Sequence, residues 1–285
     1  MSELLVPFEY NYMIRAMWVS ALVGGLCAFL SAYLMLKGWS LMGDALAHAV
    51  VPGVAIAYLL HLPYAAGAFF AGIIAALGMW GIRQATKLKE DAVIGVVFTA
   101  FFALGLLIVS IWPTPVSVQT IVLGNILGIA DEDAMQVVVV AAIALTILLI
   151  KWKDLMVTFF DESHARTVGL NPTLLKALFF TLLSASAVTA LQTVGAALVI
   201  AMVITPGATA YLLTDRFGRL IALSVAIGAS TSVVGTYISY FLDGATGGVI
   251  VTLQTLVFLV VFVFAPKHGV LAARRKSRGE TEVQP

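Results

Sequence analysis

The chain has 285 residues, of which 61% are hydrophobic and only 11% are charged, and its net charge is +1. A soluble domain carries about a quarter charged residues because its surface must face water, so this composition excludes a soluble globular protein. A nearly neutral chain gives no reason to expect nucleic acid as a partner. The single cysteine, Cys27, excludes an intrachain disulfide and a cysteine-based metal cluster.

Apolar segments, bounded by charged residues or by glycine and proline, follow one another along the chain. Each is apolar around its full circumference, which is typical of a helix surrounded by lipid and by other helices. One crossing takes ~20 residues, so we expect a single all-α integral membrane domain over residues 1–285 with about eight to nine transmembrane helices. The segments lie near residues 13–36, 41–60, 64–83, 91–112, 134–151, 173–190, 194–213, 218–241 and 247–265.

Glycine and proline interrupt several of these segments at membrane depth. The stretch 113–130 contains Pro113, Pro115, Gly124 and Gly128, which predicts a broken or re-entrant helix lining a cavity. Pro52-Gly53, Gly124-Asn125 and Thr205-Pro206-Gly207 are compatible with gates or with backbone groups that face a wet cavity. The intramembrane amides are expected to bind helix to helix; they are Gln119, Asn125, Gln192 and Gln254.

Basic residues predict the orientation, because cytoplasmic loops of membrane proteins are enriched in lysine and arginine. With a cytoplasmic C-terminus, alternation through the segments places every basic residue except Arg15 inside and the N-terminus outside. The outer side then receives Asp131, Glu132, Asp133 and Asp243. Tryptophans near segment ends are typical of an aromatic belt at the membrane surfaces; they are Trp18, Trp39, Trp80, Trp112 and Trp152.

Asp44 and His48 are the first candidates for a functional site, because they lie four residues apart and therefore on one helix face. A carboxylate and an imidazole suit divalent first-row metals such as manganese, iron or zinc. A structural role is the alternative: Asp44 near a helix start would meet the helix dipole, and His48 would hydrogen-bond a neighbouring helix. A charge near mid-bilayer costs at least ~2.5–3.5 kcal/mol, which favours the functional interpretation.

The cytoplasmic segment 154–172 is the second candidate. Asp161 or Ser163 is expected to cap a short helix, Gly169 to end it, and Asn171-Pro172 to start the next span. An ordinary solvated connection and a docking helix for a cytoplasmic partner both fit this pattern. The final residues, 277–285, are predicted to form a polar, poorly ordered tail.

Missing motifs narrow the function. The chain lacks the G-x-x-x-x-G-K-[ST] loop that cradles ATP phosphates, and it lacks H-E-x-x-H and G-x-S-x-G. Few charges lie in mid-span, whereas proton-coupled carriers usually need a relay of them. We therefore expect no enzymatic activity in this chain, and we expect another subunit to supply the energy for uphill transport.

The sequence resembles the permease subunits of bacterial ABC-type manganese, zinc and iron importers, over roughly residues 8 to 268. The most specific stretch runs from Lys37 to Gly53 and contains Gly43-Asp44-Ala45-Leu46-Ala47-His48-Ala49. The supporting stretches are Glu90 to Gly95, Leu123 to Gly128, Ala165 to Leu170 and Ile204 to Ala210. Within the family the chain looks most like the manganese and iron permeases of Gram-negative bacteria.

The resemblance implies a type II ABC importer-like bundle in the bacterial inner membrane. It implies as partners a cytoplasmic ATP-binding subunit, a second permease subunit (identical or paralogous) and a periplasmic metal-binding protein. The transported ion would be manganese, iron or zinc, with no permanently bound cofactor. Asp44 and His48 match the family's metal-coordinating positions. The coupling helix that docks on the ATPase corresponds to a segment with Asp161, Glu162, Ala165, Arg166, Gly169 and Leu170.

The expected function is import of the metal from periplasm to cytoplasm by alternating access. A stand-alone secondary carrier or channel, driven by a metal or proton gradient, is the main alternative. An intramembrane enzyme that uses Asp44 and His48 is a weaker one, since no second acid–base pair accompanies them.

Overall fold

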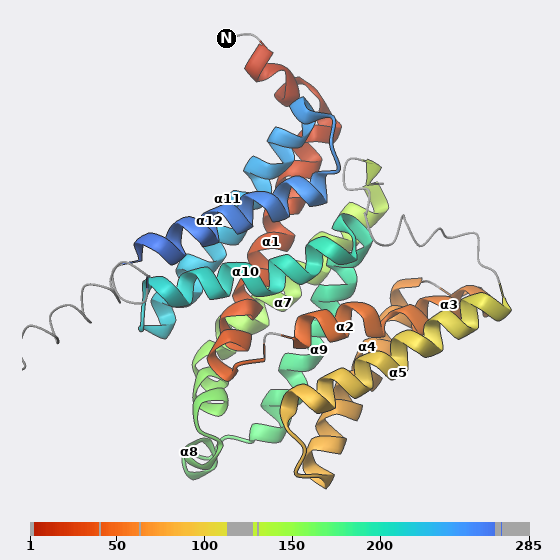
Figure 1. Ribbon diagram of the computed structural model, residues 1–285, viewed down its shortest axis with the longest axis vertical. Coiled ribbons are helices and arrows are strands. Elements are labelled where there is room, and N and C mark those ends of the chain that lie inside the picture. The colour runs from red at the N-terminus through yellow and green to blue at the C-terminus, as the bar shows by residue number, and fades with distance from the viewer. Residues whose placement is uncertain are drawn as a thin grey trace, which may run out of the picture.

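The computed structural model describes residues 3–39, 41–62, 64–112, 128–129, 131–265 and 269. The described residues form helices and connections, with no strand among them. Figure 1 shows a helical bundle with the N-terminus at one end of its long axis and α8 at the other. The elements are η1 (Glu3–Glu9), α1 (Asn11–Lys37), α2 (Met42–Ala49), α3 (Val51–Leu59), α4 (Tyr64–Ala85), α5 (Glu90–Ile111), α7 (Asp131–Phe160), α8 (Glu162–Thr167), α9 (Pro172–Val194), α10 (Ala196–Leu213), α11 (Phe217–Leu242) and α12 (Thr246–Phe264).

The predicted all-α, polytopic architecture is confirmed. Seven of the described helices are long and apolar enough to cross a membrane: α1, α4, α5, α7, α9, α11 and α12. The predicted segment 194–213 forms α10, whose apolar part, Ala201–Leu213, is shorter than a full span. The predicted segment 41–60 forms two short helices, α2 and α3, in place of one.

Pro52 explains why the segment 41–60 is broken. A proline inside a helix has no N–H to donate, and its ring collides with the carbonyl of the residue four positions earlier. That residue is His48, so α2 ends at Ala49 and α3 begins at Val51 with Pro52 in its first turn. The predicted break at Pro52-Gly53 is therefore confirmed, and it lies one helical turn beyond His48.

Pro206 has a different outcome, because α10 continues through it. Ser31 on α1 lies against this point of α10. Its Oγ donates to the carbonyl of Ile204 at 3.1 Å and accepts from the N–H of Gly207 at 3.1 Å. A side chain from a neighbouring helix thus satisfies backbone groups next to the proline, as membrane helices commonly require.

Helix α1 is the central helix of the bundle, and it packs along α11 and α10 (Figure 1). Small residues allow the backbones to approach closely: a Cβ on Gly24 would lie 2.7 Å from the carbonyl oxygen of Gly228. Ser224 Oγ donates to the carbonyl of Ala28 at 2.6 Å across the same interface. Small residues and interhelical hydrogen bonds are what hold helices together in lipid, where apolar burial gives little advantage.

Oppositely charged residues pair at the two ends of the bundle. Arg15, the one basic residue predicted to lie outside, forms an ion pair with Asp131 at the start of α7. At the other end Lys176 of α9 forms an ion pair with Glu162 of α8. The predicted division of charge between the two sides of the membrane, and with it the direction of the chain, stays a prediction.

Several predictions concern residues outside the described ranges. They are the broken helix over 113–130 (apart from residues 128 and 129), the amides Gln119 and Asn125, and the tail 277–285. The side chain of Gln192 is likewise outside the description. Gln254 does bind helix to helix, because its Nε2 donates to Thr231 Oγ1 of α11 at 3.2 Å.

Candidate functional site

Helix α2 lies inside the bundle, where it contacts α5, α10, α4 and α9 (Figure 1). Its side chains Ala45, Leu46 and Ala49 are at most 2% exposed. Gly43 brings α2 close to α10, since a Cβ there would lie 2.6 Å from Cγ1 of Val203. The helix that carries the first candidate pair is thus enclosed by other helices and does not face lipid on these sides.

His48 lies in the last turn of α2 and is half-buried. Its ring lies 5.4 Å from the ring of Phe98 and 5.4 Å from the ring of Phe102, both on α5 and both oriented edge to face. The two phenylalanines are four residues apart and stacked on each other. The imidazole therefore packs against α5 through these two rings.

Asp44 lies in the first turn of α2, and its side chain is outside the described residues. Its backbone position is one turn before His48, so both residues share one face of α2. Among the described side chains, no group of three or more histidine, cysteine, aspartate or glutamate residues could hold a metal ion. The role of Asp44 and His48 as ligands stays a prediction.

The second candidate segment has the local structure that its sequence predicts. Asp161 caps α8 by accepting from the N–H of Ser163 at 2.8 Å and of His164 at 3.1 Å. Gly169 ends the turn with a φ of 82°, a conformation that favours glycine. Asn171 caps α9 by accepting from the N–H of Leu174 at 3.2 Å. These bonds hold a six-residue helix as a compact projection between two long helices.

The side chains of α8 divide between an inner and an outer face. Ala165 is fully buried, and its carbonyl accepts from the N–H of Leu170 at 2.9 Å. This hydrogen bond closes the turn that follows α8. Arg166 and Gly169 are exposed, as is the capping residue Asp161. The predicted coupling residues thus include a group that supports the projection and a group that it presents to solvent.

Glu162 fixes α8 to the rest of the bundle. Its carboxylate accepts a hydrogen bond from Lys176, whose residue is only 5% exposed, and the charges of Lys37 and Arg83 act on it as well. Partial burial raises the pKa of Glu162, but the hydrogen bond with Lys176 and the three positive charges outweigh it and lower the pKa overall. The residue is therefore ionised at neutral pH and linked to three helical elements.

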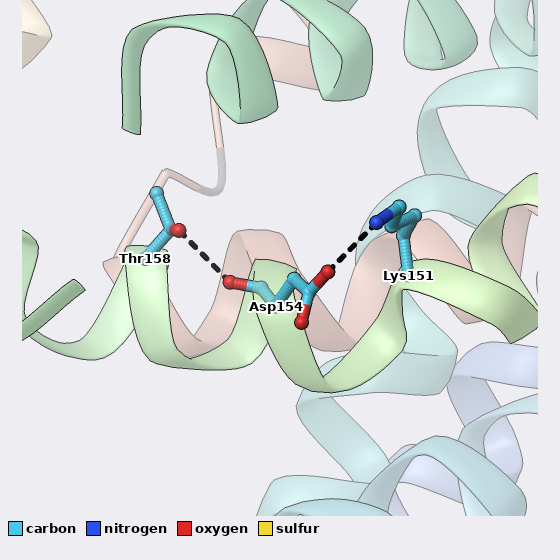
Figure 2. A network of polar contacts seen from close by, with 3 residues as sticks. All are labelled: Lys151, Asp154 and Thr158. Carbon is cyan, nitrogen blue, oxygen red and sulfur yellow. Dashed lines mark hydrogen bonds and ion pairs between the residues drawn. The ribbon is translucent and has the colours of Figure 1, made fainter. Parts of the chain in front are cut away.

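The C-terminal part of α7 carries α8 away from the apolar part of the bundle. Figure 2 shows Lys151 donating from Nζ to Asp154 Oδ2 at 3.0 Å, and Thr158 donating from Oγ1 to the carbonyl of Asp154 at 2.8 Å. With 30 residues α7 is about 45 Å long, more than a ~30 Å hydrocarbon core needs. Its last turns carry Lys151, Lys153 and Asp154, and they end next to α8.

A cleft of about 360 Å³ lies beside α8. Its walls come from the end of α1, the last turns of α7 and the connection between α10 and α11, with Asp161, His164, Tyr211 and Asp215 among the lining residues. The sequence analysis did not identify this cleft, because its walls are far apart in the chain. It also missed Phe98 and Phe102, although their four-residue spacing marks a common helix face.

Sequence comparison shows a matching family and two similar membrane proteins. A family model described as the ABC 3 transport family matches residues 9–265. The chelated iron transport system membrane protein YfeC of Yersinia pestis is 68% identical over 96% of this chain and 94% of its own length. The manganese transport system membrane protein MntB of Synechocystis is 48% identical over 96% of this chain and 90% of its own length.

A solved structure, PsaBC from Streptococcus pneumoniae in complex with Fab, is similar along nearly the whole chain. It superposes with a TM-score of 0.85 and 35% sequence identity, covering 96% of this chain and 99% of that one. The helical arrangement described above is therefore shared with a solved structure over almost its full extent.

Proposed function

Because the chain belongs to the ABC 3 transport family, we propose that this multi-pass membrane protein is the permease subunit of an ATP-driven importer for iron or manganese. The proposed cargo rests on one observation: relatives spanning nearly the full chain are named as membrane proteins of iron and of manganese transport systems. Oxygen and nitrogen ligands accept these metals and zinc alike, so zinc is included as a competing cargo.

The proposed importer has three kinds of subunit. Two permease subunits, identical or paralogous, sit in the inner membrane with the α8 end and the C-terminus in the cytoplasm. A cytoplasmic ATP-binding subunit supplies the energy, and a periplasmic metal-binding protein delivers the ion to the outer end. The division of basic and acidic residues between the two ends supports this orientation.

Asp44 and His48 are the proposed transient ligands along the path of the ion. Three features support this role: the enclosure of α2 among four helices, the aromatic side chains packed on His48, and the interruption of the helix one turn later at Pro52. Two protein ligands leave room for water or backbone oxygens. An ion held this way binds loosely enough to be released on the cytoplasmic side.

Helix α8 is the proposed docking helix for the ATP-binding subunit. Asp161, Glu162, Ala165, Arg166, Gly169 and Leu170 shape or support it, and Arg166 is exposed for contact. Packing against the end of α7 and the ion pair of Glu162 with Lys176 attach it to the bundle, so a movement of α8 is passed to α7 and α9. Alternating access then reorients the bundle around the ion.

The test is uptake of radiolabelled Mn²⁺ and Fe²⁺ by vesicles that contain the chain with its ATP-binding subunit and its binding protein. We expect uptake only with ATP, loss of more than about 90% of it in the Asp44→Ala/His48→Ala variant, and unchanged protein levels. In Arg166→Ala we expect ATP hydrolysis to continue while uptake falls. His61→Ala is the matched control, because His61 is an exposed histidine outside α2.

Each other outcome removes a defined part of the proposal. Uptake at wild-type levels in the double variant would discard Asp44 and His48 as ligands while keeping the importer. Uptake by the chain alone, without ATP, would establish the secondary carrier in its place. Strong inhibition of Mn²⁺ and Fe²⁺ uptake by Zn²⁺, together with ATP-dependent zinc uptake, would identify zinc as the transported metal.

A further inference from the structure

Six aromatic rings meet at the α8 end of the bundle, where α1, α7, α9 and α11 converge with the connection before α2. We call this cluster the aromatic junction; its members are Tyr33, Trp39, Phe159, Phe179, Phe180 and Phe217. Tyr33 contacts the rings of three of the others, and Phe159 packs on Phe179 with 4.7 Å between centroids. Close, offset and edge-to-face packing of this kind resists sliding of one ring past another.

Trp39 is the member of the junction that leads to α2. It is 4% exposed, so it does not take part in the aromatic belt that its sequence position suggested. Its ring lies 5.5 Å from Phe159 and 5.5 Å from Phe180, and the guanidinium of Arg83 lies over it at 5.5 Å. Its backbone carbonyl accepts a hydrogen bond at 3.1 Å from the N–H of Met42, which is the first residue of α2.

The backbone alone does not connect α2 rigidly to α1. Helix α1 is capped by Gly38 with a φ of 73°, and the chain changes direction before α2 begins. Besides its own packing against α5, α10, α4 and α9, α2 is therefore held at its start by the contacts of the Trp39 side chain. These contacts include α7 through Phe159, α9 through Phe180 and α4 through Arg83.

Phe159 is the member of the junction that leads to α8. It is 1% exposed and lies two residues before Asp161, which caps α8. Because α7 is helical up to Phe160, a displacement of α8 moves the ring of Phe159 with it. That ring touches Trp39 directly, so α8 and α2 are joined by one aromatic contact although they are more than a hundred residues apart in sequence.

We infer that Trp39 is a positioning residue that converts movement of α8 into movement of α2 through its contact with Phe159. The inference rests on the proposed function, in which α8 docks on the ATP-binding subunit and α2 carries Asp44 and His48. When nucleotide binding shifts α8, the ring of Phe159 displaces Trp39, and the start of α2 follows. The free energy of nucleotide binding is thereby linked to the affinity of the α2 pair for its ion.

The link is measurable as the change in Mn²⁺ affinity that a non-hydrolysable ATP analogue causes in the assembled complex in nanodiscs. For the wild type we expect the affinity to change about 5- to 150-fold. In Trp39→Ala we expect the ratio of the affinities with and without the nucleotide analogue to fall to about onefold. Trp39→Phe keeps an aromatic ring and is expected to restore much of the effect.

Two further variants separate this role from a general loss of packing. Trp112→Ala removes an exposed tryptophan at the end of α5, outside the junction, and is expected to leave the nucleotide effect unchanged. Phe159→Leu keeps most of the side-chain volume and removes the ring. It is expected to reduce the nucleotide effect as Trp39→Ala does. Combining Trp39→Ala with Phe159→Leu is expected to reduce it no further, because both changes remove the contact between Trp39 and Phe159.

The outcomes distinguish this inference from the proposed function. A wild-type complex without any nucleotide effect on Mn²⁺ binding and without ATP-dependent uptake contradicts the proposed function itself. A wild-type effect that persists in Trp39→Ala overturns the inference alone. Should Trp39→Ala fail to assemble, Phe159→Leu decides: an undiminished nucleotide effect in that variant equally overturns the inference.

Discussion

Charged residues near the α8 end show how burial and neighbours together set the state of one side chain. Glu162 is partly buried, which alone would favour its neutral form, yet Lys176, Lys37 and Arg83 keep it ionised. Lys176 is almost completely buried and depends on this carboxylate as its hydrogen-bond partner. Removing one member of such a pair leaves the other desolvated without compensation.

The pair of Glu162 with Lys176 predicts a pH-dependent stability difference. The pKa of Glu162 in the folded protein lies below its usual value of 4.5, so its contribution is present above that pH and is lost as the pH falls through the lowered pKa. At about pH 7 we expect Glu162→Gln to lower the free energy of unfolding by about 1–3 kcal/mol, at the modest end because the carboxylate is partly exposed.

Thermal unfolding in detergent at about pH 7 and about pH 3 measures this difference. Glu132→Gln, an exposed glutamate in the first turn of α7, is the matched control. A wild-type advantage over Glu162→Gln that is as large at about pH 3 as at about pH 7 would contradict the predicted ionisation of Glu162.

Two prolines in apolar segments have different effects on their helices. Pro52 separates α2 from α3, whereas Pro206 lies within a continuous α10. The difference lies in the neighbouring helix: Ser31 of α1 inserts its hydroxyl beside Pro206 and bonds on both sides of it. Helix α10 also places Val203 against Gly43 of α2, so the shape of α10 affects the position of the candidate site.

Gly207→Ala tests the contact between α10 and α1. A Cβ at position 207 would lie 2.3 Å from Ser31 Oγ and 2.7 Å from its carbonyl oxygen, so the helices must separate. We expect the free energy of unfolding to fall by about 1–3 kcal/mol, as overpacked sites typically show. Equilibrium unfolding in mixed detergent micelles measures it.

Gly78→Ala in α4 is the matched control, because a Cβ there meets nothing within 4 Å. It is expected to be neutral or to stabilise the protein by up to about 1 kcal/mol, since alanine has the higher helix propensity. Equal stability of the two alanine variants would show that the α1–α10 contact is looser than the structure has it.

At the scale of the whole molecule, charge is divided between two ends of one helical bundle. Arg15 and Asp131 pair at one end, while Glu162 lies among Lys176, Lys37 and Arg83 at the other. Between them α1 runs through the bundle, packed on α11 and α10 (Figure 1). The excess of basic residues at the α8 end predicts that this end is cytoplasmic.

Single-cysteine labelling tests that orientation, and the chain suits it because its only cysteine, Cys27, is fully buried. We expect a membrane-impermeant maleimide added to spheroplasts to label Glu132→Cys and to leave Ser163→Cys unlabelled until the membrane is permeabilised. Both positions are exposed in the structure. The unaltered chain is the control for background, and the opposite labelling pattern would reverse the proposed topology.

Features that depend on near neighbours in the chain could be predicted from sequence. Each apolar segment carries its own transfer free energy into lipid, so the helices were predictable without knowing their partners. The caps at Asp161 and Asn171, the turn at Gly169 and the break at Pro52 follow from hydrogen bonds and ring geometry within a few residues. The spacing of Asp44 and His48 likewise indicated a shared face, although their role as ligands stays a prediction.

Only the tertiary structure decided what each helix faces, because segments that are apolar on all sides carry no signal for their partners. Trp39 was predicted to lie at the membrane surface and is buried against Phe159 and Phe180. The rings beside His48 come from α5, and the hydroxyl beside Pro206 comes from α1. Such contacts arise from packing between helices that are distant in sequence, and in lipid that packing depends on shape and on hydrogen bonds more than on hydropathy.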